Sequence, residues 1–435
     1  MAAVVTLVSE LLAAGAGFLF GCMVLAAALL HSALQREFWF APSVEEEVLL
    51  KKASRDLWSL NDSPEGLSHN FIKLSNGTQI HYLAPLRPTP DSRNLLVFVH
   101  GFPDSAFLFL RQLRSTWATK AKLVALDLPG CGGSDSLNRY GPDEVLNAVA
   151  ETVALLKQRY LKANAKARCI LVGHDWGGVV ASRIAAETSG LVDHVVTLNS
   201  LYPAYAEEQL RGGVSRGSQL ISEKKFREGA FELGPVLSQL SKSAYTYMLT
   251  LPLPLAKIVP RLTRCLIKLA HDLQYKQFPD QSPQALAYRL AMSYGPSLEA
   301  ASEHLTTGPA YGRSVIERAR TWPPGDWDGR VRLYAEGLLR EVWTQSFPGA
   351  HKPQSAETKT LHFKCSVNII FGLQDVALDP RIVVDGIEKY FVNNDAVADP
   401  TQERIIRLPD CGHWSVIEEG GVRALDKVLT EILKQ

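Results

Sequence analysis

The G-H-D-W-G segment at residues 173–177 places a side chain that could act as a nucleophile in a tight turn. An apolar strand-like run at residues 169–172 precedes it, and a helix-like run of small residues at 179–187 follows it. The glycines allow a strained turn that lifts the central side chain, Asp175, above a sheet. A carboxylate that attacks an electrophilic sp³ carbon forms an alkyl ester, whereas attack on an ordinary ester would give a reactive anhydride. The pattern therefore favours opening of a strained ether or displacement of a halide.

Two later segments carry side chains that could assist this carboxylate. Asp375 follows an apolar strand-like run at residues 367–371, and His413, the last histidine of the chain, lies on a loop before the final predicted helix. A carboxylate that orients a histidine allows the histidine to take a proton from water. Asp379 is the alternative acid, but its place beside Pro380 is more typical of a helix cap.

An earlier segment, H-G-F-P-D at residues 100–104, follows an apolar run at residues 95–99. A short continuous apolar run of this kind is typical of a parallel strand that is covered on both faces. We expect His100 to be a buried histidine that fixes this loop.

Together these motifs resemble those of the epoxide hydrolases of the α/β-hydrolase superfamily, over residues 68–435. The segments that are similar to the family's HGxP, nucleophile, acid and base motifs are residues 100–103, 173–178, 372–375 and 411–414.

The resemblance implies a role for each of these residues. Asp175 would be the nucleophile, Asp375 the acid and His413 the base, in the chain order that α/β-hydrolases use. The backbone N–H groups of Phe102 and Trp176 would form the oxyanion hole.

The family also uses two lid tyrosines to hold the epoxide oxygen. Tyr245 stands seven residues before Pro252, as in the family's first tyrosine motif, and Tyr247 is the alternative. Tyr334, which precedes Trp343, is the candidate for the second tyrosine. The residues around both positions depart from the family's pattern, so packing of the lid is a competing interpretation for both side chains.

The implied reaction converts a lipophilic epoxide and water to a vicinal diol through an alkyl ester of Asp175. Haloalkane dehalogenases share the Asp nucleophile and the tryptophan that follows it. They need a second halide donor, often Asn directly after the His-Gly of the first loop, where this chain has Phe102. A hydrolase fold kept for binding or scaffolding is an alternative of another class, and the complete set of nucleophile, acid and base argues against it.

Composition narrows the range of partners. The net charge of +1 is spread over 435 residues without a basic cluster, so nothing predicts binding to nucleic acid. The six cysteines form no C-x-x-C pair, and no Cys/His cluster predicts a metal site. The implied reaction needs no cofactor. The expected partner is a small lipophilic substrate, and the oligomeric state stays open.

The N-terminal segment predicts an uncleaved transmembrane helix. Residues 1–35 contain one charged side chain, Glu10, and residues 11–30 contain no strongly polar one. Twenty helical residues span about 30 Å, the hydrocarbon thickness of a bilayer. No basic residue precedes the run, and residues 31–33 are a poor cleavage site, which disfavours a signal peptide. The nearest basic residues follow the span, so the positive-inside rule places the catalytic part in the cytosol, and an endoplasmic reticulum membrane fits this topology.

The alternation of strand-like and helix-like runs predicts an α/β protein with a mostly parallel sheet flanked by helices, the α/β-hydrolase fold. We expect residues 70–200 and 361–435 to form the two halves of the core. Residues 201–360 lack clear strand patterns and should form a helical lid over the carboxyl ends of the strands. Residues 36–69 should be a juxtamembrane lead-in, and the core should not need the anchor at 1–35.

Overall fold

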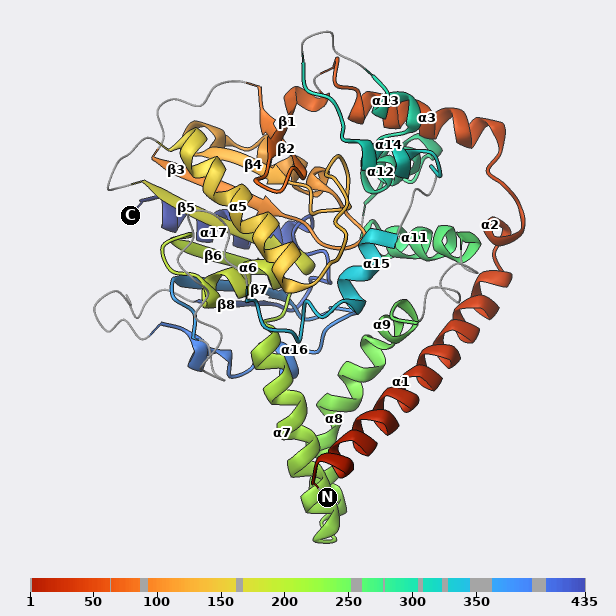
Figure 1. The fold of residues 1–435 in the computed structure, drawn as a ribbon, viewed down its shortest axis with the longest axis vertical. Helices are drawn as coiled ribbons and strands as arrows, with labels where there is room; N and C mark the ends of the chain where they lie inside the picture. The colour runs from red at the N-terminus through yellow and green to blue at the C-terminus, as the bar shows by residue number, and fades with distance from the viewer. Residues whose placement is uncertain are drawn as a thin grey trace.

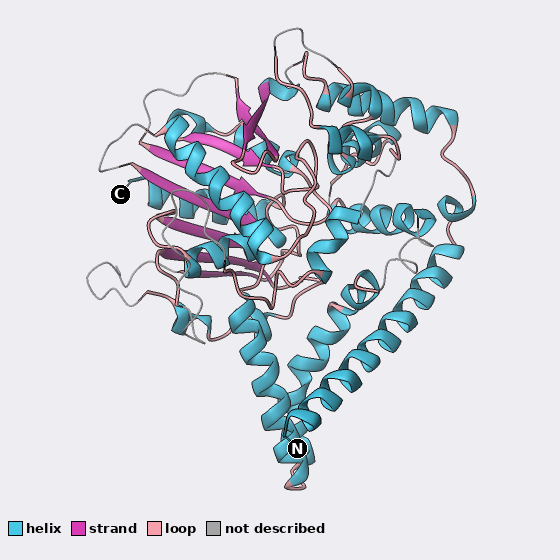
Figure 2. Cartoon of the chain, in the orientation of Figure 1, coloured by secondary structure: helices cyan, strands magenta, loops and turns pink. Residues whose placement is uncertain are grey.

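One sheet with helices on both faces forms the body of the molecule (Figures 1 and 2). The computed structural model of the chain describes residues 2–62, 64–86, 93–161, 167–251, 260–276, 278–303, 308–322, 328–344, 362–392 and 404–434. The strands are β1 (Leu67–Lys73), β2 (Gln79–Pro85), β3 (Asn94–Val99), β4 (Lys122–Leu126), β5 (Arg168–His174), β6 (His194–Leu198), β7 (Ser366–Gly372) and β8 (Ile405–Leu408).

The sheet is mostly parallel, as the sequence predicts. Its strand order is β1-β2-β4-β3-β5-β6-β7-β8. β1 and β2 form an antiparallel hairpin, β2 also pairs antiparallel with β4, and the pairings from β4 to β8 are parallel. The carboxyl ends of β3, β5, β7 and β8 therefore lie at one edge of the sheet, where open α/β sheets bind their ligands.

Each face of the sheet has its own layer of helices. The helices and 3₁₀ turns of the core are α4 (Leu110–Leu113), α5 (Pro142–Tyr160), α6 (Trp176–Glu187), α16 (Pro380–Val383), α17 (Glu419–Lys434), η1 (Pro64–Gly66), η2 (Ala106–Phe109), η3 (Thr116–Thr119) and η4 (Ile387–Tyr390). Side chains alternate across a strand, so Leu95 and Val97 of β3 pack in the cluster that holds α5 and α6. Leu96 and Phe98 point the other way, into the cluster of η2 and α17.

Between β6 and β7 the described residues form helices joined by turns and loops, with no strand among them. These helices are α7 (Pro203–Ser222), α8 (Phe226–Lys242), α9 (Ala244–Leu249), α11 (Pro260–Gln274), α12 (Pro283–Tyr294), α13 (Leu298–Ala301), α14 (Arg313–Ala319) and α15 (Asp328–Ala335). α7 and α8 pack against each other and project from the body, while α9 and α15 lie between them and α11 (Figure 1).

The N-terminus forms three helices, α1 (Ala2–Ala33), α2 (Arg36–Trp39) and α3 (Val44–Trp58). In α1 the 19 residues of Gly15–Ala33 are long and apolar enough to cross a membrane, a property that a signal sequence near an N-terminus shares. α1 does not stand apart from the body, because it packs against α9 and α11 (Figure 1).

Residues 36–69 are more than a lead-in, because α3 is part of the body. Ser43 caps this helix with a capping box, and the spacing of Leu50, Ala53 and Leu57 puts all three side chains on one buried face. Trp58 is fully buried and donates its indole N–H to the carbonyl of Ala291 in α12, with Nε1 and O 2.9 Å apart. β1 then begins at Leu67, within the segment that the sequence predicts to be a juxtamembrane lead-in.

Candidate active site

The turn between β5 and α6 holds Asp175 in a strained backbone conformation. Its φ of 49° and ψ of −120° are rare for a residue with a side chain. The two glycines are needed for close approach. A Cβ on Gly177 would lie 2.0 Å from the carbonyl oxygen of Val99, and one on Gly173 would lie 2.4 Å from that of Gly177. The side chain of Asp175 stays 18% exposed, whereas those of its histidine and acid neighbours are nearly or fully buried.

Two backbone amides converge on the Asp175 carboxylate. The N–H of Phe102 donates to Oδ2 at an N···O distance of 2.8 Å, and the N–H of Trp176 also hydrogen-bonds the carboxylate. Gly101 permits this approach, because a Cβ there would lie 2.3 Å from the same Oδ2. The amides that the sequence assigns to an oxyanion hole thus meet at one carboxylate group.

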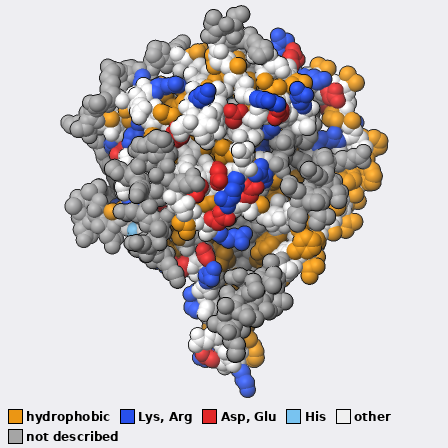
Figure 3. Space-filling view, viewed as in Figure 1, with side chains coloured by type: hydrophobic (Ala, Val, Ile, Leu, Met, Phe, Trp, Pro, Cys, Tyr) orange, Lys and Arg blue, Asp and Glu red, His pale blue; other side chains and the backbone are white. Residues whose placement is uncertain are grey.

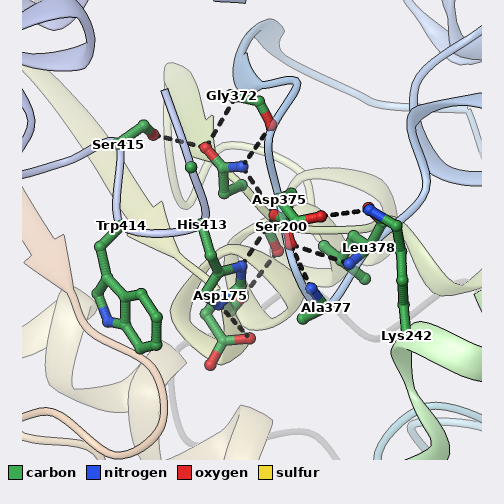
Figure 4. Close-up of polar contacts among 12 residues, drawn as sticks. Asp175, Ser200, Lys242, Gly372, Asp375, Ala377, Leu378, His413, Trp414 and Ser415 are labelled. Carbon is green, nitrogen blue, oxygen red and sulfur yellow. Dashed lines mark hydrogen bonds and ion pairs between the residues drawn. The ribbon is translucent and has the colours of Figure 1, made fainter. Parts of the chain in front are cut away.

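His413 lies between the two carboxylates (Figure 4). Its Nδ1 is 2.9 Å from Oδ2 of Asp375, and its Nε2 is 3.8 Å from Oδ1 of Asp175. A carboxylate only accepts hydrogen bonds, so Nδ1 carries a proton and Nε2 faces Asp175. His174 fixes the loop from behind, because its Nε2 lies 2.9 Å from the carbonyl oxygen of His413.

Asp375 is held from several sides. Oδ1 accepts from the backbone N–H groups of Ala377 and Leu378 at N···O distances of 2.7 and 2.9 Å. Oδ2 accepts from the side-chain amide of Asn199 at 2.7 Å as well as from His413. Asp379 instead caps α16 by accepting from the N–H of Arg381, which is the role that its position beside a proline indicates.

Sequence reasoning missed two side chains that hold this acid. Asn199 directly follows β6, and a polar residue at the carboxyl end of a central parallel strand is a signal that could have identified it. Lys242 ends α8, and its ammonium group donates to the backbone carbonyls of Asp375 and Leu378 (Figure 4). Nothing in the local sequence around Lys242 marks this long-range contact.

The charges of the site are coupled. Burial lowers the pKa of His413, but the carboxylates of Asp375 and Asp175 outweigh it and raise the pKa to about 9. Burial raises the pKa of Asp375, and the charge and hydrogen bond of His413, together with Asn199, bring it below its usual value. Burial also raises the pKa of Asp175, against the opposing effects of His413 and the two amides.

Tyr245 of α9 and Tyr334 of α15 face each other beside the turn between β5 and α6, the elbow that carries Asp175. Their ring centroids are 6.0 Å apart, and the two phenols share a hydrogen bond. The ring of Tyr334 packs edge-on against Trp176 and Phe102, with centroids 4.8 and 5.7 Å apart. Burial, with the nearby charge of Asp175, raises the pKa of both phenols, so they stay protonated as donors. Tyr247, the alternative to Tyr245, instead packs its ring against Phe20 of α1 at 5.1 Å.

Asp104 is a further buried acid near the site. Its carboxylate accepts from the indole N–H of Trp414 and the side-chain amide of Gln274, each at an N···O distance of 3.0 Å. Burial raises the pKa of Asp104 to about 6. His100 in the same loop is fully buried and holds it through the carbonyl of Gly101 and the N–H of Leu128, as we expected. Among the described residues, no group of three or more His, Cys, Asp or Glu side chains could hold a metal ion.

Comparisons with known proteins match this architecture. A model of the alpha/beta hydrolase family matches residues 96–425. Epoxide hydrolase 3 of Xenopus tropicalis is 31% identical over 167 residues, which cover 38% of this chain and 42% of that protein. Epoxide hydrolase 4 of Mus musculus is 28% identical over 152 residues, which cover 35% of this chain and 40% of that protein. The matched segments thus span less than half the length of these curated relatives.

Solved structures share the fold at lower identity. An epoxide hydrolase from Bacillus megaterium aligns with a TM-score of 0.53 and 20% identity, over 84% of this chain and 100% of that chain. The Cif epoxide hydrolase from Acinetobacter nosocomialis aligns with a TM-score of 0.50 and 17% identity, over 90% of this chain and 97% of that chain.

Proposed function

The chain belongs to the alpha/beta hydrolase family, and we propose that it is an epoxide hydrolase that forms an ester on Asp175. The observation that carries this proposal is the meeting of a carboxylate at the elbow with two protonated phenols beside it. A carboxylate nucleophile attacks sp³ carbon, and the phenols supply what an epoxide oxygen needs when its bond to carbon breaks. The likeness to curated epoxide hydrolases over part of the chain supports the same reaction.

In the first step the epoxide ring opens. Tyr245 and Tyr334 hydrogen-bond the epoxide oxygen while Asp175 attacks one ring carbon. Because Oδ2 accepts from the N–H of Phe102, Oδ1 is the attacking atom and Oδ2 becomes the carbonyl oxygen of the ester. The C–O bond of the ring breaks as the C–Oδ1 bond forms, and a phenol gives its proton to the leaving oxygen. The product of this step is a hydroxyalkyl ester.

In the second step water hydrolyses the ester. His413, oriented by Asp375, takes a proton from water, and the hydroxide attacks Cγ of Asp175. The charge that develops on Oδ2 is stabilised by the N–H groups of Phe102 and Trp176. Collapse of this intermediate breaks the Cγ–Oδ1 bond and restores the carboxylate. One proton of the water ends on the leaving oxygen and the other, first held by His413, restores the phenol, so the vicinal diol leaves and the site is regenerated.

Ester formation itself prepares His413 to act as a base. In the free site the charge of Asp175 helps to raise the pKa of His413 to about 9. The ester is neutral, so its formation removes this contribution and lowers the pKa of the imidazole. His413 therefore loses its proton more readily at the stage where a base is required.

The phenols of Tyr245 and Tyr334 favour an epoxide hydrolase over a haloalkane dehalogenase. A halide leaves without a proton, so the dehalogenase reaction gives no reason for two phenols beside the nucleophile. Phe102 also offers a phenyl ring, which donates no hydrogen bond, at the place of the second halide donor. A scaffold without activity needs neither the strained elbow nor a buried acid with four hydrogen-bond donors.

We propose further that α1 associates with a membrane and that the substrate is lipophilic. Apolar side chains crowd the edge of the molecule where α1 and α2 lie (Figure 3). The exposed ones are Phe18, Leu19, Met23, Leu30, Leu34, Trp39 and Phe40. A continuous apolar face of this kind is typical of a contact with lipid. Tyr245 lies on α9, the lid helix that packs against α1, which favours an epoxide that partitions into the bilayer.

Turnover of a substrate panel tests the function. Full-length protein purified in detergent is given aryl epoxides, fatty-acid epoxides and bromoalkanes, and both diol and bromide are measured. We expect diol from at least one epoxide. Asp410→Ala, a change at an exposed carboxylate, should form diol at the same rate as the parent protein. Bromide release without diol would support a dehalogenase, and no turnover of either class would support a scaffold.

A further inference from the structure

We infer that the N-terminal helix α1 sets the position of the site tyrosine Tyr245 by acting as the support of α9. The inference rests on the proposed function, since Tyr245 matters for turnover only if it holds the epoxide oxygen. It assigns a positioning role to Gly21 and Gly17 of α1 and to Tyr247 of α9, three residues that the reaction itself does not use.

The two helices come closest at Gly21. A Cβ on this glycine would lie 2.6 Å from the backbone carbonyl oxygen of Tyr247 and 3.0 Å from Cδ2 of Leu251. One turn earlier, a Cβ on Gly17 would lie 3.6 Å from the ring of Tyr247, and the ring of Phe20 packs edge-on against the same ring at 5.1 Å. Small residues allow the backbones of two helices to approach in this way. Gly17 and Gly21, the two glycines of a G-x-x-x-G motif in α1, thus pack against α9 of the same chain.

A small apolar cluster fixes α9 from the same side. Leu25 of α1, Met248 of α9, Leu251 just after α9, and Leu262 of α11 are buried together. This cluster is separate from the two that cover the faces of the sheet. The lid helix therefore takes its lateral position from contacts with the N-terminal helix as well as from the core.

α9 presents its two tyrosines to different neighbours. Tyr245 and Tyr247 are two residues apart, about 200° around a helix, so they point to nearly opposite sides. Tyr245 meets Tyr334 of α15, while Tyr247 meets α1. α9 is only six residues long, and a helix of this length has little stability without its packing partners. A displacement on the α1 side is therefore passed to the phenol on the other side.

A bulky residue at Gly21 should disturb one chemical step selectively. The nearest atom is a backbone oxygen, which cannot rotate away as a side chain can, so the two helices must move apart, and the six-residue α9 is the shorter of them. A misplacement of about 1 Å can slow a reaction on the order of a hundredfold. Ring opening needs the phenol, whereas hydrolysis of the Asp175 ester depends on His413 and the two amides. A general loss of structure would slow both steps.

The test compares Gly21→Ile with Gly15→Ile in the full-length protein. A Cβ on Gly15 meets nothing within 4 Å, so this change adds the same side chain to an exposed position of the same helix. Both are made in a His413→Gln background, in which the ester should accumulate, and its rate of formation from an epoxide is followed by rapid quench and intact-protein mass spectrometry. Ester hydrolysis is followed separately in variants that keep His413, from the fraction of enzyme esterified at steady state.

We expect Gly21→Ile to slow ester formation by about ten- to a hundredfold, with the rate of ester hydrolysis unchanged, and Gly15→Ile to keep both rates. Equal rates of ester formation in the two variants, or equal losses in both steps for Gly21→Ile, would overturn the inference. If Gly21→Ile does not fold, Gly21→Ala replaces it, because a Cβ alone already meets the carbonyl of Tyr247. Ester formation in the parent enzyme is required first, and its absence would reject the proposed function itself.

Discussion

The two halves of the candidate site are held in different ways. Asp175, Asp375 and His413 follow strands of one sheet and are tied by hydrogen bonds to backbone groups or to each other. Tyr245 and Tyr334 lie on short helices and are placed by the packing of rings and apolar side chains. In the proposed reaction the first set forms and hydrolyses the ester, and the second set serves ring opening alone. The steps should therefore respond differently to changes in the core and in the lid.

The largest effect is expected at the residue that both steps share. Asp175→Ala should reduce diol formation by roughly 10⁴- to 10⁶-fold, the loss that follows removal of a nucleophile. The change should leave the fold intact, because the side chain lies above the sheet, still 18% exposed, and belongs to none of the apolar clusters of the core. Circular dichroism and diol formation together measure this. A folded variant that still makes diol at a comparable rate would remove the basis of the nucleophile assignment.

Removing the base should separate the two steps. In His413→Gln, alkylation of Asp175 needs no base and should proceed, while hydrolysis should fall by about 10²- to 10⁴-fold. The ester should accumulate, and intact-protein mass spectrometry should find the mass of the enzyme plus one substrate. His362→Gln is a matched control. His362 is exposed, so this variant should turn over substrate at the parent rate. Unmodified His413→Gln enzyme after exposure to a good substrate would contradict this division of roles.

Changes to the two lid tyrosines should affect ring opening only. Tyr245→Phe and Tyr334→Phe should each slow epoxide opening, by up to about ten-thousandfold, the upper end of the range for a positioned general acid. The double variant should lose nearly all turnover, because no phenol is left to donate. Tyr247→Phe keeps its ring against α1 and should behave like the parent. A double variant that opens epoxides at the parent rate would remove the argument against a dehalogenase.

The same comparison explains how much could be predicted from the sequence. The nucleophile, acid, base and amide segments are local motifs at strand ends, so a parallel sheet brings them together once its strands are recognised. Asn199 and Lys242 hold the acid through contacts across more than a hundred residues. Only the place of Asn199 at the end of a strand could have pointed to its role, and no local pattern marks Lys242. The sequence also left Tyr245 and Tyr247 as alternatives, because which side of a short helix faces the site depends on its packing.

For a related reason, the sequence predicts that the core does not need residues 1–35. An apolar run long enough to span a bilayer gives no signal of the helix that it contacts. The structure packs α1 against α9 and buries Leu25 with the lid. Removal of residues 1–35 should therefore slow ring opening by about tenfold and leave ester hydrolysis unchanged, instead of releasing a fully active core. Single-turnover rates of the truncated and full-length proteins measure this, and identical rates of ring opening would show that α9 needs no support from α1.

The smallest expected effect concerns charge within the core half. Burial lowers the pKa of His413, and the carboxylates of Asp375 and Asp175 raise it to about 9. Asp175→Asn removes one of these carboxylates and should lower the pKa on the order of one pH unit. The pKa of His413 in the folded state exceeds the usual value of about 6.5. Protonation of His413 therefore stabilises the fold, and this contribution is complete below about pH 6.5. This stability is lost as the pH rises through about 9 in the parent, and it should be lost at a lower pH in Asp175→Asn.

Urea unfolding between pH 6 and 10, with Asp410→Asn as the control, measures the difference. Identical pH profiles for the two variants would mean that Asp175 and His413 are not coupled in the folded protein.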